Sequence, residues 1–270
     1  MGEPRTPVAL AIAGSDSGGG AGIQADLKAF AAAGVHGTTA ITAITAQNTV
    51  GVTAIHAVPG EIIVAQVEAV ASDIGVDAVK IGMLGDVATI DAVMAALDAL
   101  ADVPVVLDPV MVSESGARLL DEEARSALAE RLLPRATVVT PNLPEARALL
   151  GADERVPAAD LAAGVRRLGA EAALVTGGHA DGIDLLDDGA GQLAIPGPVH
   201  PDGAAHGSGC THSSTLAALL ALGFPLRASA REARRRTAAA VAAGLRDVGR
   251  GPGPVDALGI AGRRPRPPLA

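Results

Sequence analysis

Residues 206–214 read His-Gly-Ser-Gly-Cys-Thr-His-Ser-Ser and lead directly into 215–222, a segment rich in Ala and Leu. Two glycines flank Ser208, and the following residues favour a helix, which predicts a turn opening a buried helix. Unpaired N–H groups and the helix dipole suit such a turn to a phosphate, or to the charge that develops during its transfer. There we expect Cys210, the only cysteine, to have a lowered pKa and to accept a proton from a substrate hydroxyl. A capped helix with a small buried Cys explains the fragment at least as well.

The amino-acid composition argues against several classes of binding partner. Ala, Val, Leu and Ile dominate, Trp and Tyr are absent and Phe occurs twice, so the core is aliphatic. The lack of aromatic rings and the net charge of -9 argue against nucleic acid and an anionic membrane. One cysteine excludes an internal disulfide and a cysteine-based zinc cluster, which fits a reducing compartment. No signal peptide is evident and no apolar run approaches the roughly 20 residues that cross a bilayer, so we expect a cytoplasmic protein.

Short β-branched runs alternate with Ala/Leu-rich segments, which predicts parallel strands joined by crossover helices. The expected strands are 8–13, 38–45, 78–81, 105–107, 137–139 and 172–175, followed by a hairpin through 187–191. The expected helices are 23–33, 62–73, 87–100, 122–132, 144–150, 160–168, 210–222 and 226–246. This pattern indicates an α/β fold with both faces of a mostly parallel sheet covered. We expect one domain over 1–262 and a disordered tail, rich in Arg and Pro, over 263–270.

Polar or glycine-rich residues follow the expected strands, and open α/β sheets bind ligands beyond their carboxyl ends. The glycines of 14–22 permit close approach of the backbone to a ligand, although such loops are often only turns. The amide of Gln47 can donate to and accept from a heterocycle, or stabilise a turn. Met83 offers an adaptable apolar contact or fills the core.

Three further strand ends carry groups suited to phosphate chemistry. Asp108 can hold a hydrated Mg²⁺ that faces phosphates, although Asp before Pro is also a turn former. Asn142 and Glu145 are one helical turn apart, a spacing that fits either a shared metal shell or a capping box. Residues 176–179 end another strand with a glycine pair, which a hairpin turn also explains.

Several motifs occur in one order between about Val8 and Asp256: 14–28, 46–49, 80–84, 108–111, 140–146 and 207–211. Together they resemble the hydroxymethylpyrimidine kinase / phosphomethylpyrimidine kinase family of thiamine biosynthesis. The resemblance implies a ribokinase-like three-layer α/β/α sandwich. It also implies ATP-dependent phosphorylation, with Mg²⁺, of 4-amino-5-hydroxymethyl-2-methylpyrimidine and then of its monophosphate. Family members are commonly homodimers.

The resemblance also assigns roles to residues. The substrate pocket would comprise Gln47, which reads the pyrimidine, with Ala21, Met83, Val110 and the polar neighbour Asp26. The catalytic group would be Cys210, with Gly207, Ser208 and Gly209 neutralising the transferred phosphoryl group. ATP would contact Asn142, Thr176 and Gly178, and the metal would lie at Asp108 and Glu145.

Some positions depart from the family pattern. Thr176 stands where many relatives have Lys, so a cation that contacts phosphate is either missing or supplied elsewhere, by Lys80 or an Arg. Glu114 replaces a frequent Lys, His212 replaces an apolar residue, and Ser208 replaces Thr. Two alternatives therefore stay open: a pyridoxal or pyridoxine kinase, which acts on a similar hydroxymethyl ring, and a non-catalytic small-molecule-binding relative.

Overall fold

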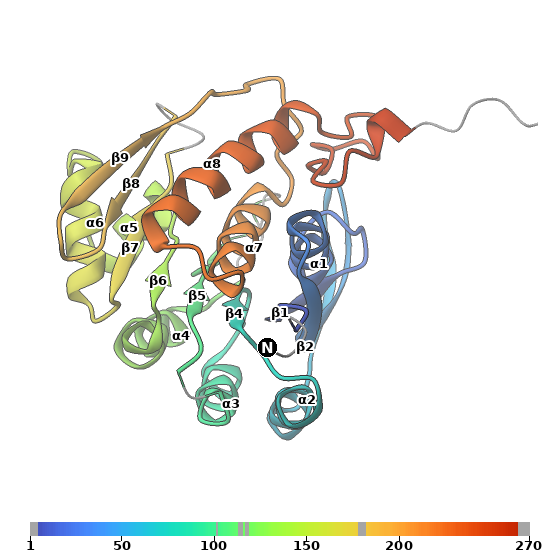
Figure 1. Cartoon of the computed structure of the whole chain (residues 1–270), viewed down its shortest axis with the longest axis vertical. Coiled ribbons are helices and arrows are strands. Elements are labelled where there is room, and N and C mark those ends of the chain that lie inside the picture. The colour runs from blue at the N-terminus through green and yellow to red at the C-terminus, as the bar shows by residue number, and fades with distance from the viewer. Residues whose placement is uncertain (1–4, 101, 113–115, 117–118, 178–181, 264–270) are drawn as a thin grey trace, which may run out of the picture.

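The computed structural model describes residues 5–100, 102–112, 116, 119–177 and 182–263 (Figure 1). Their centre is a nine-stranded sheet in the order β3-β2-β1-β4-β5-β6-β7-β8-β9. The strands are β1 (Val8–Asp16), β2 (His36–Asn48), β3 (Gly51–Ala57), β4 (Ala78–Ile81), β5 (Val105–Leu107), β6 (Val138–Val139), β7 (Ala172–Val175), β8 (Ile183–Asp187) and β9 (Gln192–Pro196). Strands β2, β1, β4, β5, β6 and β7 are parallel, while β3, β8 and β9 are antiparallel to their neighbours. The mostly parallel sheet is therefore confirmed.

Two layers of helices cover the sheet, as Figure 1 shows. One layer contains α1 (Gly22–Ala33), α7 (Ser208–Ala221) and α8 (Leu226–Ala242). The other contains α2 (Gly60–Asp73), α3 (Val87–Leu97), α4 (Glu122–Ala127), α5 (Leu143–Leu150) and α6 (Ala158–Arg167). Strand β1 shows why both faces of the sheet are covered, because apolar side chains point to each side. Leu10 and Ile12 pack into one core, and Ala9, Ala11 and Ala13 pack into the other. The alanines let α7 approach the sheet closely.

Strand β3 is the main element that the sequence pattern failed to predict. It forms the second arm of a hairpin, and Ala43 to Asn48 of β2 pair antiparallel with it. Its side chains are exposed or half-buried throughout. The sequence of β3 therefore lacks the alternation of apolar and polar residues that predicts a half-buried strand. Backbone pairing with β2 holds this strand, and it also extends β2 beyond the expected 38–45.

Helix boundaries differ where local breakers act. The expected helix 122–132 ends as α4 at Ala127 and continues as a π-helical turn over Leu128–Leu132 and a 3-10 turn over Leu133–Arg135. Pro134 causes this change, because it cannot donate the next helical hydrogen bond and disfavours α geometry before it. Helix α8 ends at Ala242, two residues before Gly244. The hairpin through 187–191 joins β8 to β9 as expected, whereas 264–270 of the predicted tail lie outside the described residues.

Candidate active site

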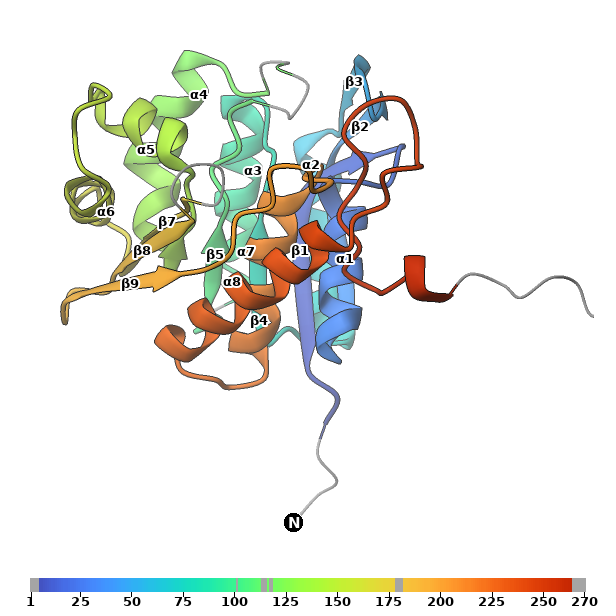
Figure 2. The same ribbon diagram turned by 90° about the horizontal axis from the view of Figure 1, so that it is seen from above.

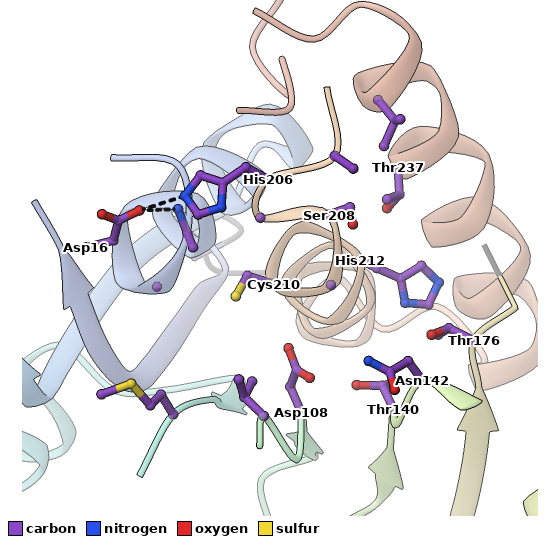
Figure 3. Close-up of a pocket in the computed structure, with 18 of the residues that line it drawn as sticks. Asp16, Asp108, Thr140, Asn142, Thr176, His206, Ser208, Cys210, His212 and Thr237 are labelled. Atoms are coloured by element: carbon purple, nitrogen blue, oxygen red, sulfur yellow. Dashed lines mark hydrogen bonds and ion pairs between the residues drawn. The ribbon is translucent and has the colours of Figure 1, made fainter. Parts of the chain in front are cut away.

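A cavity of about 510 Å³ opens at the carboxyl ends of the parallel strands, a size typical of small-ligand sites (Figure 3). The loops after these strands meet the N-terminus of α7 and one face of α8 there, as the view in Figure 2 helps to follow. Most predicted site residues line it: Ala21, Gln47, Met83, Asp108, Val110, Asn142, Glu145, Thr176, Gly207, Ser208, Gly209 and Cys210. The predicted Gly178 lies outside the described residues, as does Glu114.

The turn before α7 fits closely against the glycine-rich loop after β1. Gly207 has a φ of 80°, and a Cβ built on it would lie 1.8 Å from the carbonyl oxygen of Gly20. Only glycine allows this approach. Helix α7 begins at Ser208, so its N-terminus and partial positive charge face the cavity as predicted.

Asp16 holds the glycine-rich loop in place. Its carboxylate accepts hydrogen bonds from the N–H groups of Gly18 (2.7 Å), Gly20 (3.0 Å) and Ala21 (2.8 Å), and lies 3.2 Å from His206 Nε2. Burial alone would raise the pKa of Asp16, but His206 and the backbone donors outweigh it and lower that pKa. Sequence reasoning missed this pair, because 190 positions separate Asp16 from His206.

A buried ion pair lies beneath the α7 turn. Lys80 Nζ is 2.9 Å from Asp26 Oδ1 and 3.9 Å from Asp108 Oδ2, and the Lys80 side chain is fully buried. Burial alone would lower the pKa of Lys80. The nearby acidic groups, Asp26 above all, outweigh burial and raise that pKa, so the ammonium stays charged. Ser214 Oγ donates to Asp26 Oδ1 at 2.6 Å. Lys80 is thus committed to structural partners.

The prediction that Asp26 contacts substrate does not fit this arrangement. Asp26 is 0% exposed and is not among the residues that line the cavity. It lies on the buried side of α1, where its carboxylate is bound by Lys80 and Ser214. Asp26 therefore supports the floor of the site through Oδ1, while its Oδ2 is buried without a hydrogen-bond partner among the described residues.

The predicted lowering of the Cys210 pKa is wrong. Burial raises the pKa of the thiol to about 12, and the carboxylates of Asp26 and Asp108 add to this, while the Lys80 ammonium opposes it. The residue borders the cavity and keeps some exposure, but protein atoms and two nearby acids surround the sulfur. This balance raises the pKa far enough that Cys210 is a neutral thiol at neutral pH.

Asp108 and Glu145 place two carboxylates in the centre of the cavity. Burial and then the Asp108 charge raise the pKa of Glu145 to about 8. Glu145 Oε2 accepts from the Asn142 N–H at 2.9 Å, while Asn142 Oδ1 accepts from the Glu145 N–H at 2.8 Å, so the capping box is present. Ser213 Oγ donates to Asp108 Oδ2 at 3.0 Å.

These carboxylates fit Mg²⁺, because a divalent cation would relieve the repulsion that raises the Glu145 pKa. Across the described part of the chain, no three His, Cys, Asp or Glu side chains form a closed metal cage. Mg²⁺ needs none, since one or two carboxylates with waters and phosphates usually hold it.

The far end of the cavity, beside α8, is lined by groups that sequence reasoning mostly missed. Thr176 forms a β-bridge with Asn142, and His212, Asp184 and Arg234 lie on the same part of the wall. Figure 3 shows the His212 ring directed from α7 toward the side of Thr176 and Asn142. From the sequence, Asn142 and Thr176 as expected nucleotide contacts and the unusual residue type at His212 pointed to this region, whereas Asp184 and Arg234 were missed.

The similarity to known proteins extends over nearly all of the part of the chain that forms the sheet and the cavity. The family described as phosphomethylpyrimidine kinase matches residues 16–256. The chain belongs to this family. A hydroxymethylpyrimidine/phosphomethylpyrimidine kinase of Rhizobium meliloti is 49% identical over 257 residues, which cover 93% of this chain and 96% of that protein.

Two further relatives show the range of the phosphomethylpyrimidine kinase resemblance. Thiamine biosynthesis bifunctional protein ThiED of Geobacter sulfurreducens is 47% identical over 258 residues, or 94% of this chain but only 52% of that protein. A Bacillus subtilis pyridoxal kinase solved as an ADP complex has a TM-score of 0.86 and 35% identity, over 95% of this chain and 99% of that one. The ribokinase-like α/β fold is thereby confirmed, and the chain is a phosphotransferase.

Proposed function

We propose that this phosphotransferase uses ATP to phosphorylate 4-amino-5-hydroxymethyl-2-methylpyrimidine and then its monophosphate, in thiamine biosynthesis. The observation that carries the proposal is the continuity of the cavity. One space joins Gln47, the turn at Cys210 and the wall at Thr176, so a small heterocycle and a nucleotide can meet at the N-terminus of α7.

The substrate end suits a flat heterocycle. Gln47 Oε1 accepts from Thr45 Oγ1 at 3.1 Å, which orients the amide at the cavity wall. Met83 lies against Gly14, where a Cβ would come within 2.9 Å of Met83 Cε, so glycine leaves room for the apolar side chain. An oriented amide and an apolar wall can read the edge and the face of a pyrimidine.

The centre of the cavity suits phosphoryl transfer, which depends on positioning and charge stabilisation. ATP would supply the phosphoryl group, and Mg²⁺ held by Asp108 and Glu145 would neutralise phosphate charge. The Gly207 to Gly209 turn directs the positive end of α7 toward the transferred group. Cys210, as a neutral thiol, would orient the substrate hydroxyl, because a loose transition state requires little prior deprotonation.

A pyridoxal kinase activity is the second candidate, and the likeness to the Bacillus subtilis pyridoxal kinase favours it. A non-catalytic binding protein is the third. The test is an assay of ADP release with ATP and Mg²⁺, in which hydroxymethylpyrimidine, its monophosphate and pyridoxal are offered in parallel. Turnover of both pyrimidines supports the proposal, turnover of pyridoxal alone supports the second candidate, and ligand binding without any turnover supports the third.

We further propose a cytoplasmic homodimer built on a single domain over 1–262. Ile44, Val50 and Ile55 of the β2–β3 hairpin are about half exposed, at 52%, 49% and 50%, and place apolar side chains at the sheet edge, with Ile44 and Ile55 on opposite faces of the hairpin. Within the described residues, no helix combines the length and apolar character needed to cross a bilayer. Light scattering after gel filtration would test the dimer, and Ile55→Lys should shift the mass toward the monomer.

A further inference from the structure

The cavity end beside α8 collects buried polar atoms without hydrogen-bond partners. Eight such side-chain atoms occur among the described residues, and five of them lie at this end. They are Asp184 Oδ2, His212 Nδ1, His212 Nε2, Arg234 Nε and Thr237 Oγ1. We call these four residues the α8 cluster; their exposure is 1%, 5%, 6% and 6%. Each unsatisfied buried group costs about 1–3 kcal/mol, so a ligand that pairs with them would recover part of that cost.

Two members of the cluster are fixed by the backbone. Asp184 Oδ1 accepts from the Gly177 N–H at 3.0 Å and lies 3.7 Å from Arg234 Nε. Arg234 donates through Nη2 to the carbonyls of Gly182 at 2.9 Å and Pro198 at 3.2 Å. These contacts hold the carboxylate and the guanidinium in place before any ligand arrives.

His212 differs, because neither ring nitrogen makes a hydrogen bond within the described structure. Its Nε2 is 3.3 Å from Asp184 Oδ2 without the orientation of a hydrogen bond. A small rotation of the ring would let one nitrogen donate to Asp184 while the other donates to an anion in the cavity. The Asp184 carboxylate, whose Oδ2 has no hydrogen-bond partner among the described residues, lies within reach of the ring and would fix its orientation.

We propose that His212 binds the non-transferred phosphates of the nucleotide, with Asp184 as its positioning residue. This inference rests on the proposed ATP-dependent function. His212 lies two residues after Cys210 on α7, and its ring points away from the substrate end toward Thr176 (Figure 3). If the transferred phosphoryl group occupies the α7 N-terminus, the rest of the polyphosphate can extend past His212. Arg234 adds positive charge at the same end.

The test measures binding of ADP, AMP and adenosine, with Mg²⁺, by titration calorimetry to the full chain and to His212→Leu. We expect His212→Leu to weaken ADP binding at least about tenfold, the effect of losing one hydrogen bond to a charged group. Binding of adenosine and of hydroxymethylpyrimidine should stay unchanged. His212→Gln, which keeps an N–H donor, should recover part of the loss.

Two further variants separate a phosphate contact from a structural effect. Thr176→Lys in the His212→Leu background places a cation on the same part of the cavity wall and should restore ADP binding. His36→Leu removes an exposed histidine at the amino end of β2 and should change nothing. Normal ADP binding by His212→Leu, or an equal loss for adenosine, overturns the proposal while the kinase function stands. A wild-type protein that binds no nucleotide and phosphorylates no pyrimidine overturns both.

Discussion

At the cavity end beside β1, Asp16 accepts hydrogen bonds from three backbone N–H groups and contacts His206, whereas beside α8 five buried atoms have no hydrogen-bond partner among the described residues. At the first end, the conformation of the glycine-rich loop is held by the protein's own hydrogen bonds. The second end keeps unused hydrogen-bonding capacity at a cost in stability. A substrate pocket with fixed shape can discriminate among small rings, while a region with unsatisfied donors gains most when a ligand arrives.

The largest expected effect is at the cavity end beside β1, where Asp16 holds the glycine-rich loop. Asp16→Ala leaves the N–H groups of Gly18, Gly20 and Ala21 without their acceptor, so we expect a loss of about 3 kcal/mol in the free energy of unfolding. Urea unfolding measures it. Asp16→Asn, which retains one acceptor oxygen, should lose less. An unchanged urea midpoint for Asp16→Ala would mean that the loop is held by other contacts, and the contrast between the two ends would disappear.

The second largest effect is expected on turnover, at Cys210, where the two ends of the cavity meet. Cys210→Ala should lower turnover about 100-fold, the size of effect expected when a reacting group is misplaced by about 1 Å, and leave ADP binding within about twofold. Because burial raises the Cys210 pKa to about 12, the wild-type rate should show no ionisation of this thiol between pH 6 and about 9. Steady-state rates across that range check both points. Unchanged turnover in Cys210→Ala would remove the thiol from the mechanism.

The sequence predicted the position of the site better than its electrostatics. Alternating strands and helices place Gln47 near the end of β2 and Asp108, Asn142 and Thr176 after β5, β6 and β7, and this follows from the topology of a parallel sheet. The Cys210 pKa could not be predicted, because it depends on how deeply the sulfur is packed and on Asp26 and Asp108, which are distant in the sequence.

The unpredicted parts share a physical origin. Strand β3 has no burial period, so only its pairing with β2 reveals it. The α8 cluster combines residues from β8, α7 and α8, and the absence of a partner is visible only when all neighbours are placed. The local sequence pattern indicates which residues have reactive or polar side chains. The packing determines which of those side chains are satisfied by protein partners and which can bind a ligand.

A moderate effect is expected at the metal-binding carboxylates in the centre. Glu145 has a folded pKa of about 8 and an ordinary value of 4.5, so the metal-free protein loses stability as pH rises from about 4.5 to 8. Glu145→Gln keeps an acceptor without the charge and should be more stable than wild type by on the order of a few kcal/mol at pH 8.5 in EDTA, with little difference near pH 4.5.

Urea midpoints at the two pH values measure this difference. Mg²⁺ should stabilise the wild type at pH 8.5 and have much less effect on Glu145→Gln, because the variant lacks one anionic ligand. A stability difference that is independent of pH would show that Glu145 is ionised in the folded, metal-free protein. Its carboxylate would then act mainly through the capping box with Asn142.

The smallest effect separates the two ends most directly. Thr237→Val replaces a buried hydroxyl that lacks a partner by a methyl group of the same shape, so we expect the free protein to gain up to about 1 kcal/mol. The matched control is Thr215→Val on α7, where the hydroxyl donates to the Thr211 carbonyl at 2.6 Å and its removal should cost about 1 kcal/mol. Opposite signs in urea unfolding would confirm that the α8 end carries unused polar capacity. Equal losses would mean that ordered water already satisfies Thr237, and that nucleotide binding there must displace it.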